Sequence, residues 1–267
     1  MNASLDRFSL GNSRQNGDNL RAVTPRVCAI IPTYENPTTV GKVAARVREY
    51  IDDVFVIDDG SSEPGRAAVA SLQDAGIATV LHRAHNGGKG AAMADGFALA
   101  HERGFTHALQ IDADGQHDCA DIPRFLEACR KNPNALIAGQ PVFDETAPKS
   151  RKRARKITHV LCAIEVGSLK LGDPLCGFRV YPIEASLATR TPAMKMDFDP
   201  EIAVRLFWSG TPIVKLTVKV RYFTAAEGGV SHYRLVQDTA LIGWMHVRLC
   251  TWALLRALCW PVRQLTQ

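Results

Sequence analysis

The sequence predicts an α/β fold in which a mostly parallel β-sheet is covered by helices on both faces. From residue 27 onward, short apolar runs of strand length alternate with longer stretches of helical character. Parallel strands need crossover connections of about this length, usually a helix. Strands that read as continuous apolar runs are typical of sheets buried on both faces. The 267 residues are enough for one large domain with an appendage.

Five apolar segments are the expected strands. They are "VCAIIP" (27–32), "VFVIDDGS" (54–61), "ATVLHR" (78–83), "HALQID" (107–112) and "ALIAGQ" (135–140). Each is bounded by the Gly, Pro, Asp or Asn residues that commonly end strands.

The expected helices lie between these strands and after them. Pro64 and Gly76 stand at the start and the end of the second helix, where each is favoured. The third helix, over 88–104, is rich in Ala and ends at Gly104. The other expected helices cover 38–51, 121–133 and 196–210.

Polar groups follow three of the predicted strands. "PTYEN" follows the first strand, "DDGS" ends the second, and "DADGQHD" follows the fourth. Turn formation explains any one of these groups, because Asp, Asn and Gly favour turns. The carboxyl ends of parallel strands meet at one edge of the sheet, which is where ligands bind in such folds. The shared edge therefore predicts a binding site.

The "DADGQHD" segment carries the side chains best suited to a metal ion. Asp112, Asp114 and Gln116 offer hard oxygen ligands, which suit Mg²⁺ or Mn²⁺ that also bind substrate phosphate. A lone turn histidine such as His117 is more often a surface or supporting group than a ligand.

Two further segments suit a nucleotide. Asp58 and Asp59 form an acidic pair in which one residue can cap the turn at Gly60 while the other accepts from a ribose or a base. "HNGGKGAA" (85–92) enters a helix, so its backbone N–H groups and Lys89 can meet an anion, although a plain glycine loop is the alternative. It is not a P-loop, because no Ser or Thr follows the lysine.

"AIIPTYEN", "FVIDDGS", "HNGGKGAAMADGFALA", "QIDADGQHD" and "DPLCGFRVYP", in this order and spacing, resemble a family-2 glycosyltransferase of the GT-A fold. The resemblance covers about residues 26–225, and the nearest subgroup is the dolichol- or polyprenyl-phosphate sugar transferases. It implies an inverting enzyme that binds a nucleotide-diphosphate sugar with Mg²⁺ or Mn²⁺ and moves the sugar to an acceptor, which we expect to be lipid-linked, either a polyprenyl phosphate or another membrane lipid. No "QxxRW" motif is present, which argues against polymerisation.

The resemblance also implies roles for individual residues. The residues that it indicates for the nucleotide sugar are Pro32, Tyr34, Glu35, Asp58, Asp59, Lys89 and Asp112. The metal ligands that it indicates are Asp112, Asp114 and Gln116. The candidate catalytic carboxylates are Asp112, Asp114, Asp199 and Glu201.

Asp199 and Glu201 have an ordinary explanation as well, because acids are favoured at the start of a helix. A carboxylate base is needed for a hydroxyl acceptor but not for a phosphate, which is already ionised. The acceptor class therefore stays open between the two.

For an acceptor phosphate, the resemblance indicates a set of basic residues. The candidates are Arg151, Arg153, Arg155, Arg179 and His232. The register of the first three is open, because "GQPVFDETAP" replaces the usual Arg-containing segment. His232 stands where the subgroup has Lys, in the loop "AEGGVSHYR" (226–234), which is expected to be a lid over the diphosphate.

The C-terminal stretch predicts contact with a membrane surface. Residues 239–262 combine Trp244, Trp252 and Trp260 with Leu and scattered Arg, as amphipathic interfacial helices do. A helix that packs in the core or dimerises is the alternative. The run "KSRKRARK" (149–156) suits anionic lipid or a lipid phosphate, and a solvated helix face is the alternative. We expect no nucleic-acid partner. The expected location is cytoplasmic, peripheral on the inner face of the membrane.

Composition adds further expectations. The seven Cys form no CxxC pair, so they predict small core residues of a reducing compartment, and neither a disulfide framework nor a zinc site. The expected organisation is a polar disordered lead over 1–25 without a secretory signal, the transferase domain over 26–225, and the lid loop with amphipathic helices over 226–267.

Two other functions were weighed. A sugar-nucleotide nucleotidylyltransferase shares the α/β sheet, but its Gly-rich loop with Arg should follow the first strand, where this chain has "PTYEN". An inactive nucleotide-binding scaffold at a membrane predicts loss of the metal ligands, and the intact "DADGQ" argues against it.

Overall fold

The computed structural model describes residues 24–143, 149–221, 223 and 234–264. These residues form a seven-stranded sheet in the order β3-β2-β1-β4-β6-β5-β7. The strands are β1 (Val27–Thr33), β2 (Val54–Asp58), β3 (Thr79–His82), β4 (His107–Gln110), β5 (Leu136–Phe143), β6 (Arg179–Pro182) and β7 (Ile213–Val220). β6 is antiparallel to both its neighbours, and the other described pairs are parallel. The prediction of a mostly parallel sheet is confirmed.

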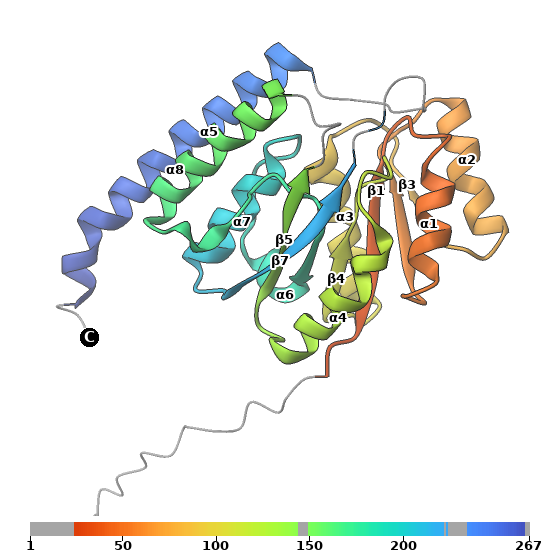
Figure 1. Cartoon of the computed structure of the whole chain (residues 1–267), viewed down its shortest axis with the longest axis horizontal. Coiled ribbons are helices and arrows are strands. Elements are labelled where there is room, and N and C mark those ends of the chain that lie inside the picture. Colours follow the sequence, from red (N-terminus) through yellow and green to blue (C-terminus); the bar gives the residue numbers. More distant parts are fainter. Residues whose placement is uncertain (1–23, 144–148, 222, 224–233, 265–267) are drawn as a thin grey trace, which may run out of the picture.

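Helices cover the sheet on both sides (Figure 1). They are α1 (Val40–Arg48), α2 (Glu63–Asp74), α3 (Lys89–Glu102), α4 (Ile122–Lys131), α5 (Lys149–Val166), α6 (Ile183–Ala188), α7 (Phe198–Trp208) and α8 (Leu235–Gln264), with short 3-10 segments at Cys119–Asp121 and Leu169–Leu171.

The sheet separates two apolar cores. Ala29 and Ile31 of β1 face the core that α1, α2 and α4 cover. Cys28 and Ile30 of the same strand face the core formed with α3, α6 and α7. Successive side chains of a strand point to opposite faces, so a strand that must be apolar on both has no polar alternation. This accounts for the continuous apolar runs in the sequence.

Two strands, β6 and β7, were not among the predicted ones. β6 is only four residues long and lies inside the segment "DPLCGFRVYP". β7 is an edge strand, and its half-exposed sequence "IVKLTVKV" mixes Lys and Thr with apolar residues. Neither has the length and apolar character that identified the other five.

The C-terminal stretch forms one helix, α8, and not the several helices that were expected. Gly243 lies within it without ending it, as a single helical glycine is tolerated. Among the described residues, no helix combines the length and the apolar character that crossing a membrane requires. The predicted lead over 1–25 falls almost entirely outside the described residues, as does the lid loop up to residue 233.

Candidate active site

The strand ends that carry polar residues lie next to one another, as the sequence predicts. Thr33 at the end of β1 is in register with Asp58 at the end of β2, and Asp58 with His82 of β3. On the other side of β1, Ile30 is in register with Gln110, two residues before Asp112. The segments "PTYEN", "DDGS" and "DADGQHD" therefore share one edge of the sheet.

Lys89 is the centre of this edge. Its Nζ lies 2.6 Å from Asp112 Oδ1 and 2.6 Å from Asp199 Oδ2. The side chains of Lys89 and Asp199 are 15% and 8% exposed, whereas that of Asp112 is 27% exposed. We call these three residues the Asp112–Lys89–Asp199 triad. It joins the turn after β4 to the first turns of α3 and α7.

Lys89 and Asp112 of the triad keep their charges at neutral pH. Burial opposes the charge on Lys89, but Asp112 and Asp199 outweigh it, so the pKa of the ammonium is raised. Burial alone would raise the pKa of Asp112, yet Lys89 and then His117 outweigh it and lower that pKa. Gln110 Nε2 donates to Asp199 Oδ1 at 3.0 Å, which fixes the second carboxylate. Each carboxylate is thus held by the lysine.

The backbone around the triad is tightly packed, and glycines make this possible. A Cβ on Gly177, in "LCGF", would lie 2.4 Å from Asp112 Oδ2. Gly88 has φ +95°, and a Cβ there would lie 2.4 Å from the Met194 carbonyl oxygen. Only glycine fits at either position without a shift of the neighbouring segment.

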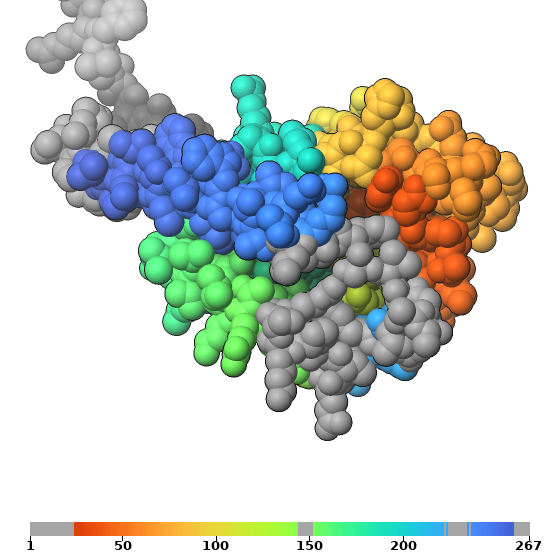
Figure 2. All heavy atoms as spheres, turned by 90° about the horizontal axis from the view of Figure 1, so that it is seen from above, coloured from red at the N-terminus to blue at the C-terminus, as the bar shows by residue number. Residues whose placement is uncertain are grey.

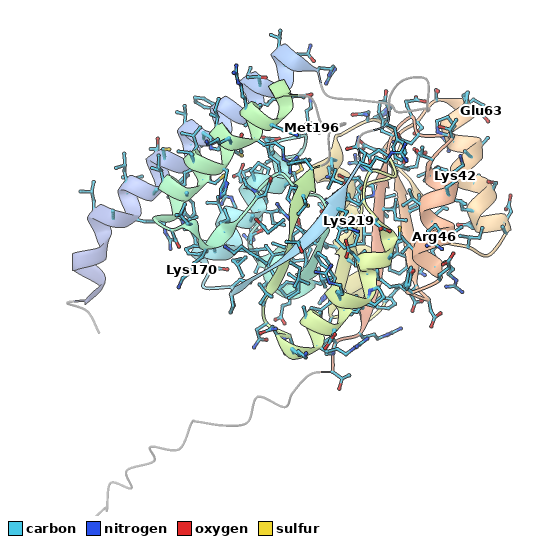
Figure 3. The ribbon with its side chains drawn as sticks, viewed as in Figure 1. Lys42, Arg46, Glu63, Lys170, Met196 and Lys219 are labelled. Atoms are coloured by element: carbon cyan, nitrogen blue, oxygen red, sulfur yellow. The ribbon has the colours of Figure 1, made fainter. Side chains whose placement is uncertain are left out.

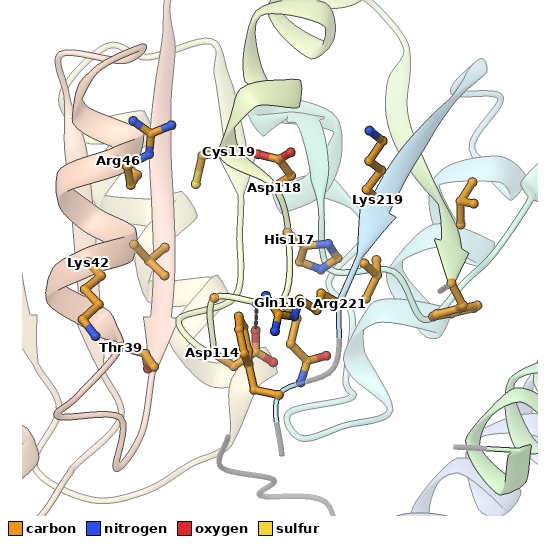
Figure 4. A pocket seen from close by; sticks show the side chains of 16 residues that line it. Thr39, Lys42, Arg46, Asp114, Gln116, His117, Asp118, Cys119, Lys219 and Arg221 are labelled. Carbon is orange, nitrogen blue, oxygen red and sulfur yellow. Dashed lines mark hydrogen bonds between the residues drawn. The ribbon is translucent and has the colours of Figure 1, made fainter. Parts of the chain in front are cut away.

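The turn that follows Asp112 is fixed at both of its sides. The Gln116 N–H donates to Asp114 Oδ1 at 2.9 Å, and the Arg221 N–H donates to the Gln116 carbonyl at 3.0 Å. His117 forms a bridge with Val220 of β7. Figure 4 shows the Asp114 and Gln116 side chains close together in one cleft. Carboxylate and amide oxygens so placed match the ligands that Mg²⁺ and Mn²⁺ prefer, so the residues present fit such an ion.

His117 is a neutral group in this turn. Burial lowers its pKa to about 4, although Asp112 partly opposes the shift. Its ring lies 5.5 Å from that of Phe178, centroid to centroid. Within the described part of the chain, the buried Nδ1 atom has no hydrogen-bond partner. The imidazole therefore carries no charge near pH 7.

The residues indicated for the base and the ribose have structural partners. Both carboxylate oxygens of Glu35 accept from Ser62, from its N–H at 2.6 Å and its hydroxyl at 2.8 Å. Asp58 accepts from the Ser61 N–H at 3.1 Å and pairs with His82 Nδ1 at 2.8 Å. Pro32 is buried in β1. Tyr34, just beyond β1, is half-buried. The turn explanation for Asp58 is confirmed by its contact with Ser61.

Asp59 organises the Gly-rich loop. It accepts from the Gly87 N–H at 2.9 Å and from the Gly88 N–H at 2.6 Å, and it also pairs with Arg83. The two N–H groups at the start of α3 thus bind a carboxylate of the chain itself. Gly87 and Gly88 therefore already have a partner, and contact of the other N–H groups of this loop and of Lys89 with an external anion stays a prediction.

The two acids of α7 have different surroundings. Asp199 belongs to the triad, whereas the fully buried Glu201 pairs with Arg205 at 2.7 Å and with Arg248 of α8 at 2.7 Å. Residues two apart on a helix lie on nearly opposite faces. Glu201 therefore binds α7 to α8 and does not face the metal-binding turn, so its expected catalytic role lacks access.

The arginines indicated for an acceptor phosphate are dispersed. Arg179 is 1% exposed and donates to the carbonyls of Asp199 and Pro174 and to the Tyr181 hydroxyl. Arg155 makes two hydrogen bonds to Asp173, at 3.1 and 2.9 Å. Arg153 is exposed on α5, and the side chain of Arg151 and all of His232 lie outside the described residues. Arg179 therefore stabilises the backbone next to the site, and its buried side chain is not accessible to a ligand.

A cleft of about 790 Å³ opens beside the metal-binding turn, between α1 and β7. Its walls include Asp114 and Gln116, together with four cations that the sequence did not single out: Lys42, Arg46, Lys219 and Arg221. Figure 3 locates Lys42 and Arg46 on α1 and Lys219 on β7. On a helix, basic residues four apart look like an ordinary solvated face. Only the position of β7 beside the turn brings these four cations to the walls of one cleft.

Comparison with known proteins identifies relatives. The model of the family described as "Glycosyl transferase family 2" matches residues 28–186. The chain is 30% identical to the undecaprenyl-phosphate mannosyltransferase of Micrococcus luteus, over 86% of this chain and 94% of that protein. It is 28% identical to the polyprenol monophosphomannose synthase of Mycolicibacterium smegmatis, over 78% of this chain and 81% of that protein.

Solved structures share the fold. Glucosyl-3-phosphoglycerate synthase from Mycobacterium tuberculosis, in complex with Mn²⁺ and UDP-glucose, superposes with a TM-score of 0.63 at 14% identity. The match covers 85% of this chain and 79% of that one. This likeness concerns the arrangement of the sheet and its helices.

Proposed function

Because the chain belongs to glycosyltransferase family 2 and has a GT-A fold, we propose that it moves one sugar from a nucleotide-diphosphate sugar to a polyprenyl phosphate. The observation that carries the proposal is the turn with Asp112, Asp114 and Gln116, held at the carboxyl edge of the sheet beside a cationic cleft. The names of the two mannosyl transferases that resemble it support a polyprenyl-phosphate acceptor.

The donor side of the site is the sheet edge. We propose that Asp112, Asp114 and Gln116 hold Mg²⁺ or Mn²⁺, and the Mn²⁺ and UDP-glucose bound by the solved relative support this assignment. Such an ion supplies Lewis-acid stabilisation of the departing diphosphate. The nucleoside is bound by five residues: Pro32, Tyr34, Glu35, Asp58 and Asp59. Three of them, Glu35, Asp58 and Asp59, act mainly by fixing the loops through hydrogen bonds.

The acceptor side is the cationic cleft. Lys42, Lys219 and Arg221 line this cleft and offer positive charge to a phosphate, whereas Arg46, also in its wall, is paired with Glu49. In the proposed reaction an acceptor phosphate oxygen bonds to the anomeric carbon while the bond from that carbon to the diphosphate oxygen breaks, and the nucleoside diphosphate leaves. The attacking oxygen is already ionised, so no base is required. Asp199, which Lys89 neutralises, positions the lysine and Asp112.

A donor panel tests the first half of the proposal. We expect one nucleotide sugar, with Mn²⁺, to stabilise the protein by about 2.7 kcal/mol at 100 times its dissociation constant, a shift of several degrees in Tm. Glu127→Gln, an exposed change on α4, serves as a control that keeps the shift. If no uridine or guanosine diphosphate sugar raises the Tm in the presence of Mn²⁺, the donor assignment is wrong.

A membrane-facing surface follows from the same proposal. α5 and α8 lie side by side, as both views show (Figures 1 and 2). α8 exposes Trp244 (63%), Val247 (56%) and Leu258 (73%), which stand at spacings of one helix face. α5 exposes Ile157 (62%) and Ile164 (65%) beyond the basic residues at its start. We propose that this α5–α8 surface rests on the cytoplasmic face of a membrane that contains anionic lipid.

Vesicle binding tests this surface. We expect Val247→Glu with Leu258→Glu to lower the fraction that sediments with phosphatidylglycerol vesicles at least tenfold, because two charges enter the exposed apolar face that contacts the membrane in this proposal. The matched control, Ala67→Glu with Ser71→Glu on exposed α2, should sediment like the wild type. Equal binding of the two double variants would contradict the assignment.

A further inference from the structure

A cluster of metal-binding side chains lies between α5 and α8. α5 contributes Cys162 and Glu165, and α8 contributes His246 and Cys250. Donor atoms of Cys162, Glu165 and His246 all lie within 4.8 Å of one another, and these three residues are buried. Cys250 Sγ lies 3.8 Å from Glu165 Oε1. None of the four lines the cleft of the proposed active site.

The spacing of these residues suits a shared ligand. Cys162 and Glu165 are three apart on α5, and His246 and Cys250 are four apart on α8, so each pair occupies one face of its helix. The two faces meet at the helix interface, where His246 Nδ1 lies 2.6 Å from Glu165 Oε1. Three donors, from Cys162, Glu165 and His246, thus lie close together across the helix interface, and Cys250 lies next to Glu165.

The cluster contains buried polar atoms whose hydrogen-bonding capacity is not used. Two of its buried atoms, Glu165 Oε2 and His246 Nε2, have no hydrogen-bond partner in the part of the chain that the structure describes. The neighbouring buried acid, Glu201, is paired with both Arg205 and Arg248. Glu165 instead faces a histidine and thiols. A buried polar atom without a hydrogen-bond partner is costly, so these orphaned atoms point to a ligand.

We propose that Cys162, Glu165, His246 and Cys250 bind a Zn²⁺ ion that fixes α8 to α5. Thiolate, imidazole and carboxylate are the ligands of structural zinc, which is four-coordinate and tetrahedral. Zn–S and Zn–N bonds of about 2.3 and 2.0 Å place such ligand atoms roughly 3.3–3.8 Å apart. Binding requires the His246–Glu165 hydrogen bond to open, and each cysteine gives its proton to solvent as the zinc–thiolate bond forms.

This proposal departs from the expectation from the cysteines, which predicted no zinc site. That expectation rested on the lack of a CxxC pair. Glu165 and His246 are 81 residues apart in the chain, so no local spacing marks the site. The alternative is a hydrogen-bonded His–Glu pair that packs between two thiols without any metal.

Metal analysis of the full chain decides between a zinc site and a metal-free His–Glu pair. After expression with zinc and dialysis, we expect about one equivalent of zinc in the wild type and in Asp114→Ala, which separates this ion from any ion at the proposed active site. Cys162→Ser with Cys250→Ser should lose it, whereas Cys129→Ser, a buried cysteine outside the cluster, should keep it. Circular dichroism checks that each variant is folded.

Cobalt gives a readout that needs no variant. Co²⁺ loaded into the wild type should produce an intense thiolate-to-metal charge-transfer band in the near ultraviolet, and zinc should abolish the band by competition. A wild type that holds less than about one tenth of an equivalent of zinc, or a Co²⁺ spectrum without the thiolate band, would overturn the proposal.

Discussion

Asp114→Ala should lower the rate of sugar transfer by about 10³-fold while the protein stays folded. The turn would lose one of its oxygen ligands, and the Lewis-acid contribution of a metal is worth several kcal/mol, which corresponds to roughly this factor. The Asp114 carboxylate also accepts from the Gln116 N–H, so a second ligand would be less well oriented. Raising the Mn²⁺ concentration should restore part of the rate.

The matched control for this change is Asp118→Ala. Asp118 lies in the same segment and lines the same cleft, but its carboxylate caps a 3-10 turn through the Ala120 N–H. We expect transfer by this variant to stay within a few-fold of the wild type. If transfer or donor hydrolysis persists in Asp114→Ala with the metal chelated, the metal-dependent mechanism is wrong.

Lys89→Met should lower the free energy of unfolding by about 3–5 kcal/mol, because it leaves the buried Asp199 and the partly buried Asp112 carboxylates close together without their cation. The same variant should lose most of its transfer activity. Urea unfolding monitored by tryptophan fluorescence measures the first effect, at constant pH near neutrality.

Two controls make the stability result specific. Adding Asp199→Asn to Lys89→Met removes one of the two carboxylates left without a cation, so it should recover part of the lost stability. Lys131→Met breaks an ion pair whose side chains are 69% and 60% exposed, so it should change stability little. Equal stability of Lys89→Met and Lys131→Met would show that the triad is not a buried charge cluster.

The sheet edge was predictable from sequence because its elements are local. β1 and β2 are buried on both faces and appear as nearly unbroken apolar runs, whereas β4 is a short buried strand that also contains His107 and Gln110. The polar residues after these three strands meet at one edge of the sheet. The connecting helices are similarly marked by glycine, proline and apolar spacing. These signals depend only on neighbours in the chain.

Contacts between distant segments were not predictable in the same way. Lys89 and Asp199 are 110 residues apart, and nothing in their local sequence indicates that they pair. Arg179 was indicated by resemblance for an acceptor phosphate, yet its place in β6 buries it against Pro174 and Tyr181. The four cations line the same cleft only because β7 pairs with β5 and the end of β7 lies beside the turn.

The most direct test of the proposed function is transfer of a radiolabelled sugar from its nucleotide diphosphate to a polyprenyl phosphate in detergent. We expect a labelled lipid that forms only with Mg²⁺ or Mn²⁺, and no product when the corresponding polyprenol, which lacks the phosphate, is supplied. Transfer to the free alcohol in preference to the phosphate, or formation of labelled lipid after complete removal of divalent metal, would contradict the account.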